Sequence, residues 1–207
     1  MSAVTRPWID VTRQVSAGMA IWPGDPKPVI EQIASIDGVS FCNLSSVSMS
    51  VHTGTHMDAP LHFIAGAASM DAMPLDAVIG EARVVEVSDP VAVRAADLPA
   101  DLAEGERILF KTRNSTGLWD KPGFQQDFVY ISHEAAQALA GIKVRTVGID
   151  YLSIGGFQAD MLETHLAILG AGIWVIEGLD LSQVEPGPYE MVCLPLRLVG
   201  VEGSPAR

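Results

Sequence analysis

The segment 51–63 reads VHTGTHMDAPLHF and holds three of the five histidines in the chain, His52, His56 and His62, together with Asp58. Imidazole nitrogens and carboxylate oxygens are the protein ligands of catalytic zinc, and carboxylate-rich sites also bind harder ions such as manganese. Structural zinc usually takes cysteine thiolates, and this segment has none. The residue types therefore predict a catalytic metal site, with a solvated or chance cluster of histidines as the alternative.

The local sequence predicts how these side chains are brought to one point. Gly54 and Pro60 prevent a continuous helix and favour a tight turn. Residues 39–51 have the alternation of a strand, so we expect this strand to present the histidine cluster at its end. Functional residues often lie where a rigid element ends and a loop begins, and this placement supports a functional cluster.

Two further candidates, His165 and Glu177, belong to a predicted strand, helix and strand. The apolar run 144–150 predicts a buried strand, a helix follows with a predicted capping box at Asp160 and Glu163, and 173–176 is a second buried strand. Such a unit predicts a right-handed crossover and a parallel pair of strands, which puts Glu177 at a carboxyl end. As alternatives, His165 is a core histidine and Glu177 an ordinary solvated carboxylate.

Trp22 opens the sequence Trp-Pro-Gly-Asp, which is typical of a turn. Its indole ring is either a packed cap or a flat surface for an aromatic substrate.

The other segments predict an α/β fold. Ser132 is expected to cap a helix that ends at Gly141. Strands are expected at residues 8–11, 29–33, 82–87, 107–111, 128–131 and 191–199.

Length and composition limit the class of protein. The chain has 207 residues and 48% hydrophobic residues, which suits one domain, 1–207, with a substantial core. A net charge of −12 argues against a nucleic-acid or anionic-membrane partner. The first residues, MSAVTRPWIDVT, contain no apolar stretch of the length expected for a signal peptide, and no run approaches the length of a membrane-spanning helix, so we expect a cytoplasmic protein. Cys42 and Cys193 are expected to be core thiols, with one disulfide as the alternative.

Residues 52–62 match every fixed position of the H-x-G-T-H-x-D-x-P-x-H signature. The chain therefore resembles the metal-dependent cyclase/hydrolase family that includes bacterial kynurenine formamidase and isatin hydrolase. The resemblance extends to the Trp22 turn, to Val-Gly-Ile-Asp at 147–150, and to His165 followed by Glu177. The segment 151–162 departs from the formamidase pattern, which concerns the choice of substrate and not the type of reaction.

The resemblance implies a role for each candidate. His52, His56 and Asp58 would bind one metal ion, while Asp58 and Glu177 would bridge to a second ion completed by His165. The general acid/base would be His62, and Trp22 would stack on the substrate. The cofactor would be two divalent ions, zinc first and manganese as the alternative.

The resemblance also implies a swivelling β/β/α domain whose mixed sheet is partly closed into a barrel with flanking helices. We expect a homodimer or larger homo-oligomer acting on a small aromatic amide. Hydrolysis of N-formyl-L-kynurenine is the leading hypothesis. A cyclic amide or lactone is the nearest alternative, and a non-catalytic metal-binding protein is an alternative of another class.

Overall fold

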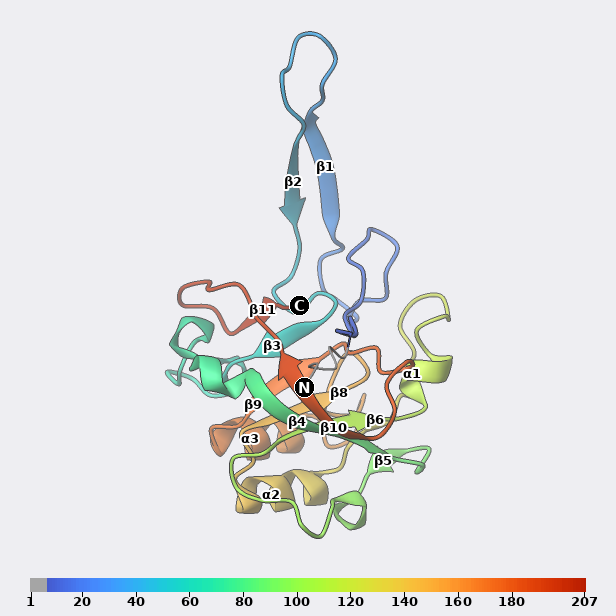
Figure 1. Cartoon of the computed structure of the whole chain (residues 1–207), viewed down its shortest axis with the longest axis vertical. Coiled ribbons are helices and arrows are strands. Elements are labelled where there is room, and N and C mark those ends of the chain that lie inside the picture. The colour runs from blue at the N-terminus through green and yellow to red at the C-terminus, as the bar shows by residue number, and fades with distance from the viewer. Residues whose placement is uncertain (1–6) are drawn as a thin grey trace, which may run out of the picture.

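A seven-stranded mixed sheet forms the centre of the computed structural model, which describes residues 7–207 (Figure 1). Its strands, in the spatial order β10-β4-β6-β8-β9-β3-β11, span Gly187–Val192, Ile79–Glu86, Arg107–Lys111, Thr146–Ile149, Trp174–Glu177, His56–Asp58 and Gly203–Pro205. Strands β4, β6, β8 and β9 run parallel to one another. Strand β10 is antiparallel to β4, β3 to β9, and β11 to β3. The α/β class and the parallel pair β8 and β9 are confirmed.

The helices are few and short. Two of them, α2 and α3, pack on each other beside the sheet (Figure 1). The helices α1, α2 and α3 span Asn114–Gly117, His133–Ile142 and Met161–Gly170, and the 3-10 turns η1 to η4 span Pro60–His62, Met70–Ala72, Leu75–Ala77 and Ala95–Asp97. Two small sheets pair β1 (Val29–Ala34) with β2 (Leu44–Ser48) and β5 (Ala92–Val93) with β7 (Tyr130–Ile131).

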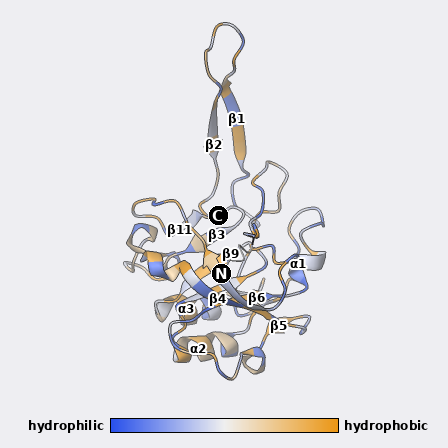
Figure 2. Ribbon diagram, in the orientation of Figure 1, coloured by the Kyte–Doolittle hydropathy of each residue, from blue (hydrophilic) through white to orange (hydrophobic). Residues whose placement is uncertain are grey.

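The central strands are buried on both faces, as their continuous apolar runs predict. Along β6, Ile108 and Phe110 belong to the core cluster that includes residues of α2 and α3, whereas Leu109 belongs to the cluster on the opposite face. Figure 2 shows hydrophobic stretches on central strands such as β9, and also on the protruding strand β1. The two core clusters, one on each face of the sheet, pack around the strands whose ends carry the candidate site.

Helix caps were predicted with mixed success. The hydroxyl of Ser132 accepts a hydrogen bond from the backbone N–H of Ala135, which confirms the predicted start of α2. The capping box predicted at Asp160 is wrong, because Asp160 has a left-handed backbone with φ of 53° and makes no cap hydrogen bond in α3. Its carboxylate accepts from the backbone N–H of His133 instead, so it joins the starts of the two helices.

The predicted partly closed barrel is wrong. The sheet is open, because its outer strands β10 and β11 each pair with only one neighbour in the described chain. Closure would require these two edges to meet, and both contain a proline, Pro188 in β10 and Pro205 in β11. Proline has no N–H to donate, so these edges are poor partners for another strand.

Four smaller predictions are also corrected. Residues 8–11 form no strand, and the next residue, Thr12, makes an isolated bridge to Leu179. Of residues 39–51, only 44–48 form a strand, and a turn follows before the histidine motif. The strand expected at 191–199 ends at Val192. Cys42 is exposed, whereas Cys193 is buried as expected, and burial raises its pKa to about 12.

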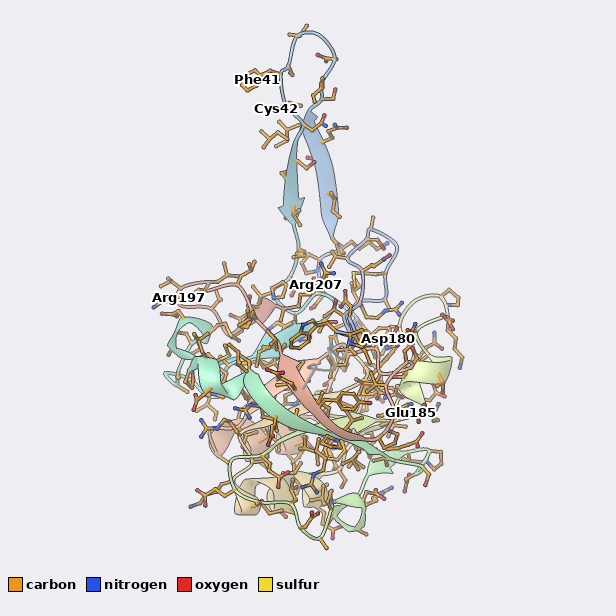
Figure 3. All side chains as sticks on the ribbon, viewed as in Figure 1. Phe41, Cys42, Asp180, Glu185, Arg197 and Arg207 are labelled. Atoms are coloured by element: carbon orange, nitrogen blue, oxygen red, sulfur yellow. The ribbon has the colours of Figure 1, made fainter. Side chains whose placement is uncertain are left out.

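Strands β1 and β2 form a long hairpin that stands away from the rest of the chain (Figures 1 and 3). Several of its apolar side chains face solvent, and those of Val39 and Phe41 near the tip are each 94% exposed. A two-stranded hairpin alone is marginally stable in water, because its apolar side chains have no packed surface to bury them. The apolar side chains of this hairpin lack such burial. Among residues 7–207, no helix has the length and apolar character needed to span a bilayer.

Candidate metal centre

Strand β3 carries two of the predicted ligands on one face. His56 and Asp58 are two residues apart, so their side chains point the same way, while Met57 points into the core on the other side. Strand β9 lies beside β3, and its last residue, Glu177, is paired directly with His56. The side chains of paired residues share one face of a sheet, so Glu177 meets the other two.

The turn before β3 explains the fixed residues between the first two histidines. Gly54 has a left-handed backbone with φ of 69°, which glycine adopts without strain. The hydroxyl of Thr55 donates a hydrogen bond of 2.6 Å to the carbonyl of Gly178 and accepts one from the backbone N–H of Arg13. This turn is thereby fixed against the end of β9, and His52 is folded back over β3.

Helix α3 supplies the remaining ligand candidate. His165 lies one turn before Ile168 and Leu169, which are buried in the core, so the helical period turns it inward. His165 Nε2 lies 3.5 Å from Glu177 Oε1, and its ring stacks on Phe63 with centroids 4.1 Å apart.

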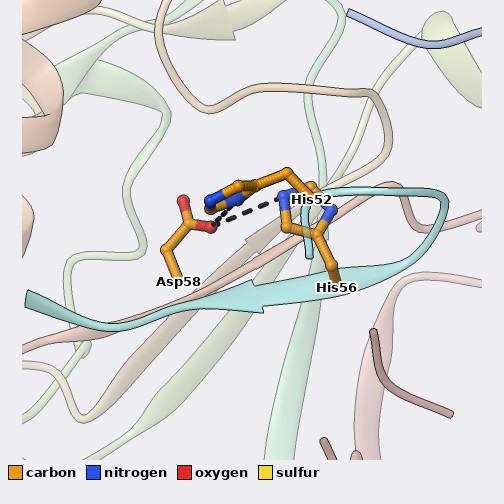
Figure 4. Close-up of side chains that lie close together, drawn as sticks. All are labelled: His52, His56 and Asp58. Carbon is orange, nitrogen blue, oxygen red and sulfur yellow. Dashed lines mark ion pairs between the residues drawn. The ribbon is translucent and has the colours of Figure 1, made fainter. Parts of the chain in front are cut away.

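The predicted ligands form two groups that share Asp58. Within each group, one possible ligand atom per residue lies within 4.8 Å of the others, and the groups are His52, His56 and Asp58, and Asp58, His165 and Glu177. Figure 4 shows the first group. Asp58 Oδ1 lies 2.9 Å from His52 Nδ1 and 3.4 Å from His56 Nε2. The grouping matches the two sets of ligands that the family resemblance implies.

Unsatisfied polar atoms show that these residues fit a cation. Both carboxylate oxygens of Asp58 and Nε2 of His56 are buried and make no hydrogen bond within residues 7–207. Leaving such a group unpaired typically costs about 1–3 kcal/mol, or more when it is charged. A cation coordinated by these oxygen and nitrogen atoms would remove that cost.

The electrostatics of the site point the same way. Burial opposes ionisation of Asp58 and Glu177, but the neighbouring histidines outweigh it and lower the pKa of each carboxyl. Burial also opposes protonation of His56 and His165, yet the carboxylates raise both pKa values, that of His56 to about 10. The two buried carboxylates therefore need positive charge beside them, which a divalent cation would supply in place of protons.

His62 lies at the edge of this cluster and belongs to neither ligand group. It ends η1, and its ring stacks on His52 with centroids 4.1 Å apart. The pKa of His62 is lowered, because the effect of burial is larger than the opposing effect of the negative charge of Asp58. His62 is therefore a neutral, half-buried base next to the ligands, while Asp58, His56, His165 and Glu177 are buried.

Trp22 packs in an aromatic cluster. Its ring makes edge contacts with Phe124, Phe128 and Phe157 at centroid distances of 5.0–6.3 Å. In the described chain, no aromatic contact joins it to the histidines. The turn predicted at Trp22 is present, because the backbone N–H of Asp25 donates to its carbonyl.

Sequence reasoning missed two segments that complete the site. The loop after β8 donates a hydrogen bond of 2.6 Å from the backbone N–H of Ile154 to Glu177 Oε1. Strand β11 lies along β3 and brings Glu202 within 3.7 Å of His52. A backbone donor has no side-chain signal, and nothing in the last seven residues marks them as a strand beside the histidine motif.

Comparisons with known proteins show the family of this chain. Residues 9–155 match the Cyclase family, described as "Putative cyclase". The chain is 40% identical over 202 residues to "Kynurenine formamidase" of Salinibacter ruber, covering 96% of this chain and 94% of the relative.

Solved structures show the same fold. A "Potential Metal-Dependent Hydrolase With Cyclase Activity" has a TM-score of 0.83 and 36% identity and covers 96% of this chain and 94% of its own. Isatin hydrolase A from Labrenzia aggregata has a TM-score of 0.78 at 22% identity, covers 95% and 90% of the two chains, and shows likeness of fold alone. On its motif, its geometry and its full-length relatives, the chain belongs to the Cyclase family.

Proposed function

We propose that this protein is a metal-dependent arylformamidase, a single-domain enzyme that converts N-formyl-L-kynurenine into L-kynurenine and formate. The observation that carries the proposal is the pair of ligand groups joined through Asp58, beside a histidine that neither group uses. The choice of substrate is supported by the relative of 40% identity that is named a kynurenine formamidase and covers nearly the whole chain.

His52, His56 and Asp58 would hold one divalent ion, and Asp58, Glu177 and His165 the second. Nitrogen and carboxylate ligands suit zinc, which we propose as the native metal, with manganese as the alternative. When bound, such ions lower the pKa of water and polarise a carbonyl.

His62 performs the proton transfer. Hydrolysis adds water to the formyl carbon, breaks the bond between that carbon and the aryl nitrogen, and releases formate and the amine. His62 accepts a proton from the attacking water and donates it to the leaving nitrogen. Its lowered pKa suits this role, because the imidazole is neutral and ready to accept at neutral pH.

The aromatic cluster around Trp22 would face the aryl ring of the substrate. Tyr151 packs against Phe128 in this cluster, and its carbonyl accepts from the backbone N–H of Gly178, next to Glu177. The cluster is therefore tied through the backbone to the end of β9. This connection supports a role for Trp22 in stacking on a flat substrate.

Two other functions compete with this proposal. An enzyme that opens a cyclic amide such as isatin would use the same residues, and likeness of fold to isatin hydrolase keeps that reading open. A metal-binding protein without turnover would have no use for His62. Rates of hydrolysis of N-formyl-L-kynurenine and isatin, measured side by side on the same metal-loaded sample, separate the three. Faster turnover of isatin overturns the formamidase assignment, and no turnover of either favours the binding protein.

We further propose a homo-oligomer in which the β1–β2 hairpin packs on another copy of the chain. The exposed Val39 and Phe41 side chains of the hairpin support this arrangement. The experiment is a measurement of solution mass by light scattering for wild type and Phe41→Ser. We expect a dimer or larger species that dissociates in the variant, and a monomeric wild type would contradict it. A cytoplasmic location stays a prediction of the sequence.

A further inference from the structure

Two histidines of the metal centre have their outer nitrogen fixed by the backbone. His56 Nδ1 lies 3.0 Å from the carbonyl oxygen of Gly54, and His165 Nδ1 lies 2.6 Å from that of Met161. A carbonyl only accepts, so both Nδ1 atoms carry a proton, and both Nε2 atoms are the ones that can offer a lone pair to a metal ion. Partners of this kind typically hold a metal-binding histidine in its working orientation.

His52 is turned the other way. Its Nδ1 faces the ligand group, 2.9 Å from Asp58 Oδ1. Its Nε2 is buried and makes no hydrogen bond within residues 7–207. For Nδ1 to offer a lone pair, the proton must be on Nε2, and that N–H then needs an acceptor. In the part of the chain that the structure describes, no backbone carbonyl accepts from this nitrogen, in contrast to His56 and His165.

The C-terminal strand brings a carboxylate to this nitrogen. Glu202 Oε1 lies 3.7 Å from His52 Nε2, longer than the usual N–H···O distance of about 2.7–3.2 Å. The Glu202 side chain is 42% exposed, so it has room to rotate and close the gap. Its backbone is fixed, because the Glu202 carbonyl accepts a hydrogen bond of 2.8 Å from the N–H of Ala59 at the end of β3.

The residue after Glu202 makes room for the ring. Gly203 is paired with Asp58 across β11 and β3. A side-chain carbon at Gly203 would lie 2.6 Å from Cε1 of His52 and 3.1 Å from its Nδ1. The imidazole therefore rests on the α-carbon of Gly203, and any larger residue would displace it.

We propose that Glu202 is a positioning residue for His52. The Glu202 carboxylate accepts the Nε2–H of His52 and so directs the Nδ1 lone pair into the first metal site, while Gly203 leaves room for the imidazole ring. Strand β11 then completes one metal site and leaves the other, at His165 and Glu177, unaffected. This inference rests on the proposed metal binding, and not on the identity of the substrate.

The test is a chelator-competition titration of metal-free protein with zinc, repeated with cobalt to follow the visible spectrum of the bound ion. We expect Glu202→Ala to weaken one of two zinc equivalents by about 10–100-fold, as loss of such a partner does elsewhere, and to spare the other. Glu202→Gln, whose amide oxygen still accepts, should recover part of this loss. The control is Glu190→Ala, an exposed glutamate on the opposite edge strand β10, which should match wild type.

Gly203→Ala should weaken the same zinc equivalent by displacing the ring. The unfolding midpoint of metal-free Glu202→Ala should equal that of metal-free wild type, since the side chain is part exposed. A lower midpoint without metal would mean a structural role and overturn the inference. Two unchanged zinc affinities in Glu202→Ala would also overturn it and leave the proposed function standing. A wild type that binds no zinc or cobalt would overturn both.

Discussion

His56 and Glu177 are paired directly across the antiparallel strands β3 and β9, and His56 Nε2 lies 3.3 Å from Glu177 Oε2. This register of β3 against β9 brings the histidine motif beside the carboxyl end of the parallel strands. A shift by one residue would turn the ligands of one strand to the opposite face and separate the two metal groups.

Asp58 is the residue on which both metal ions should depend. It belongs to both ligand groups, whereas His165 belongs to one. We predict that Asp58→Asn loses both ions and all activity, and that His165→Ala loses one ion. The measurement is metal content per chain by elemental analysis after dialysis. Retention of two ions by Asp58→Asn would contradict the shared carboxylate.

His62 should matter for turnover and not for metal content. We predict that His62→Ala keeps its metal and lowers kcat by about 10²-fold or more, because proton transfer to the leaving nitrogen is lost. His133→Ala is the matched control, since this histidine lies at the start of α2 and in neither ligand group. Steady-state kinetics with parallel metal analysis checks both, and unchanged kcat in His62→Ala would sink the acid/base role.

Gly178 should be intolerant of any side chain. It has φ of 74°, and an added carbon would collide with the carbonyl of Gly54. We predict that Gly178→Ala costs more than about 2 kcal/mol of stability, from a strained backbone together with overpacking, and that it reduces metal content.

Gly172 is the control for Gly178. Its φ is 75°, but the space around it is open, so Gly172→Ala carries the backbone cost alone, about 1–2 kcal/mol. Denaturant unfolding of both variants gives the difference. Equal losses of unfolding free energy would show that the close approach to Gly54 is unimportant.

Asp150 should give stability a distinctive pH dependence. Its buried carboxyl accepts hydrogen bonds from the N–H and hydroxyl of Thr112 and from the N–H of Ser115. Burial raises its pKa above the ordinary value and outweighs these bonds, which lower it. The folded chain thus holds this proton to a higher pH than the unfolded chain, and the stability that Asp150 contributes falls as pH rises through its raised pKa.

Asp150→Asn tests this dependence. The variant should be less stable by about 1–3 kcal/mol, because one carbonyl oxygen cannot accept every bond. As pH rises from about 4, the ordinary pKa of an aspartate, through the raised pKa of Asp150, the deficit of the variant should shrink, since only wild type loses stability by ionising this group. Urea unfolding across that range measures the deficit. A deficit that grows with pH would mean that the hydrogen bonds outweigh burial.

The sequence predicted the features that local chemistry determines. The motif at 52–62 drew attention to His52, His56, Asp58 and His62, whose side chains lie close together, and the apolar run before Asp150 predicted β8. Ser132 marked the start of α2 because capping is a local hydrogen bond.

Features that depend on contacts between distant segments could not be predicted from local sequence patterns. Strand β11 is three residues long and is a strand only because β3 lies beside it. Whether the sheet closes depends on its two edges, which no local pattern relates to each other. The alternation around β2 puts Val47 on the apolar face of a strand, but no local pattern shows what that face packs against, and Val47 is 56% exposed because the hairpin extends away from the cores.

The most direct test of the account is hydrolysis of N-formyl-L-kynurenine by protein of known metal content, before and after removal of the metal by a chelator. We predict about two ions per chain, turnover that disappears with the metal, and turnover that returns on addition of zinc or manganese. Undiminished turnover by the metal-free protein, or two bound ions with no turnover of this substrate, would contradict the proposed function.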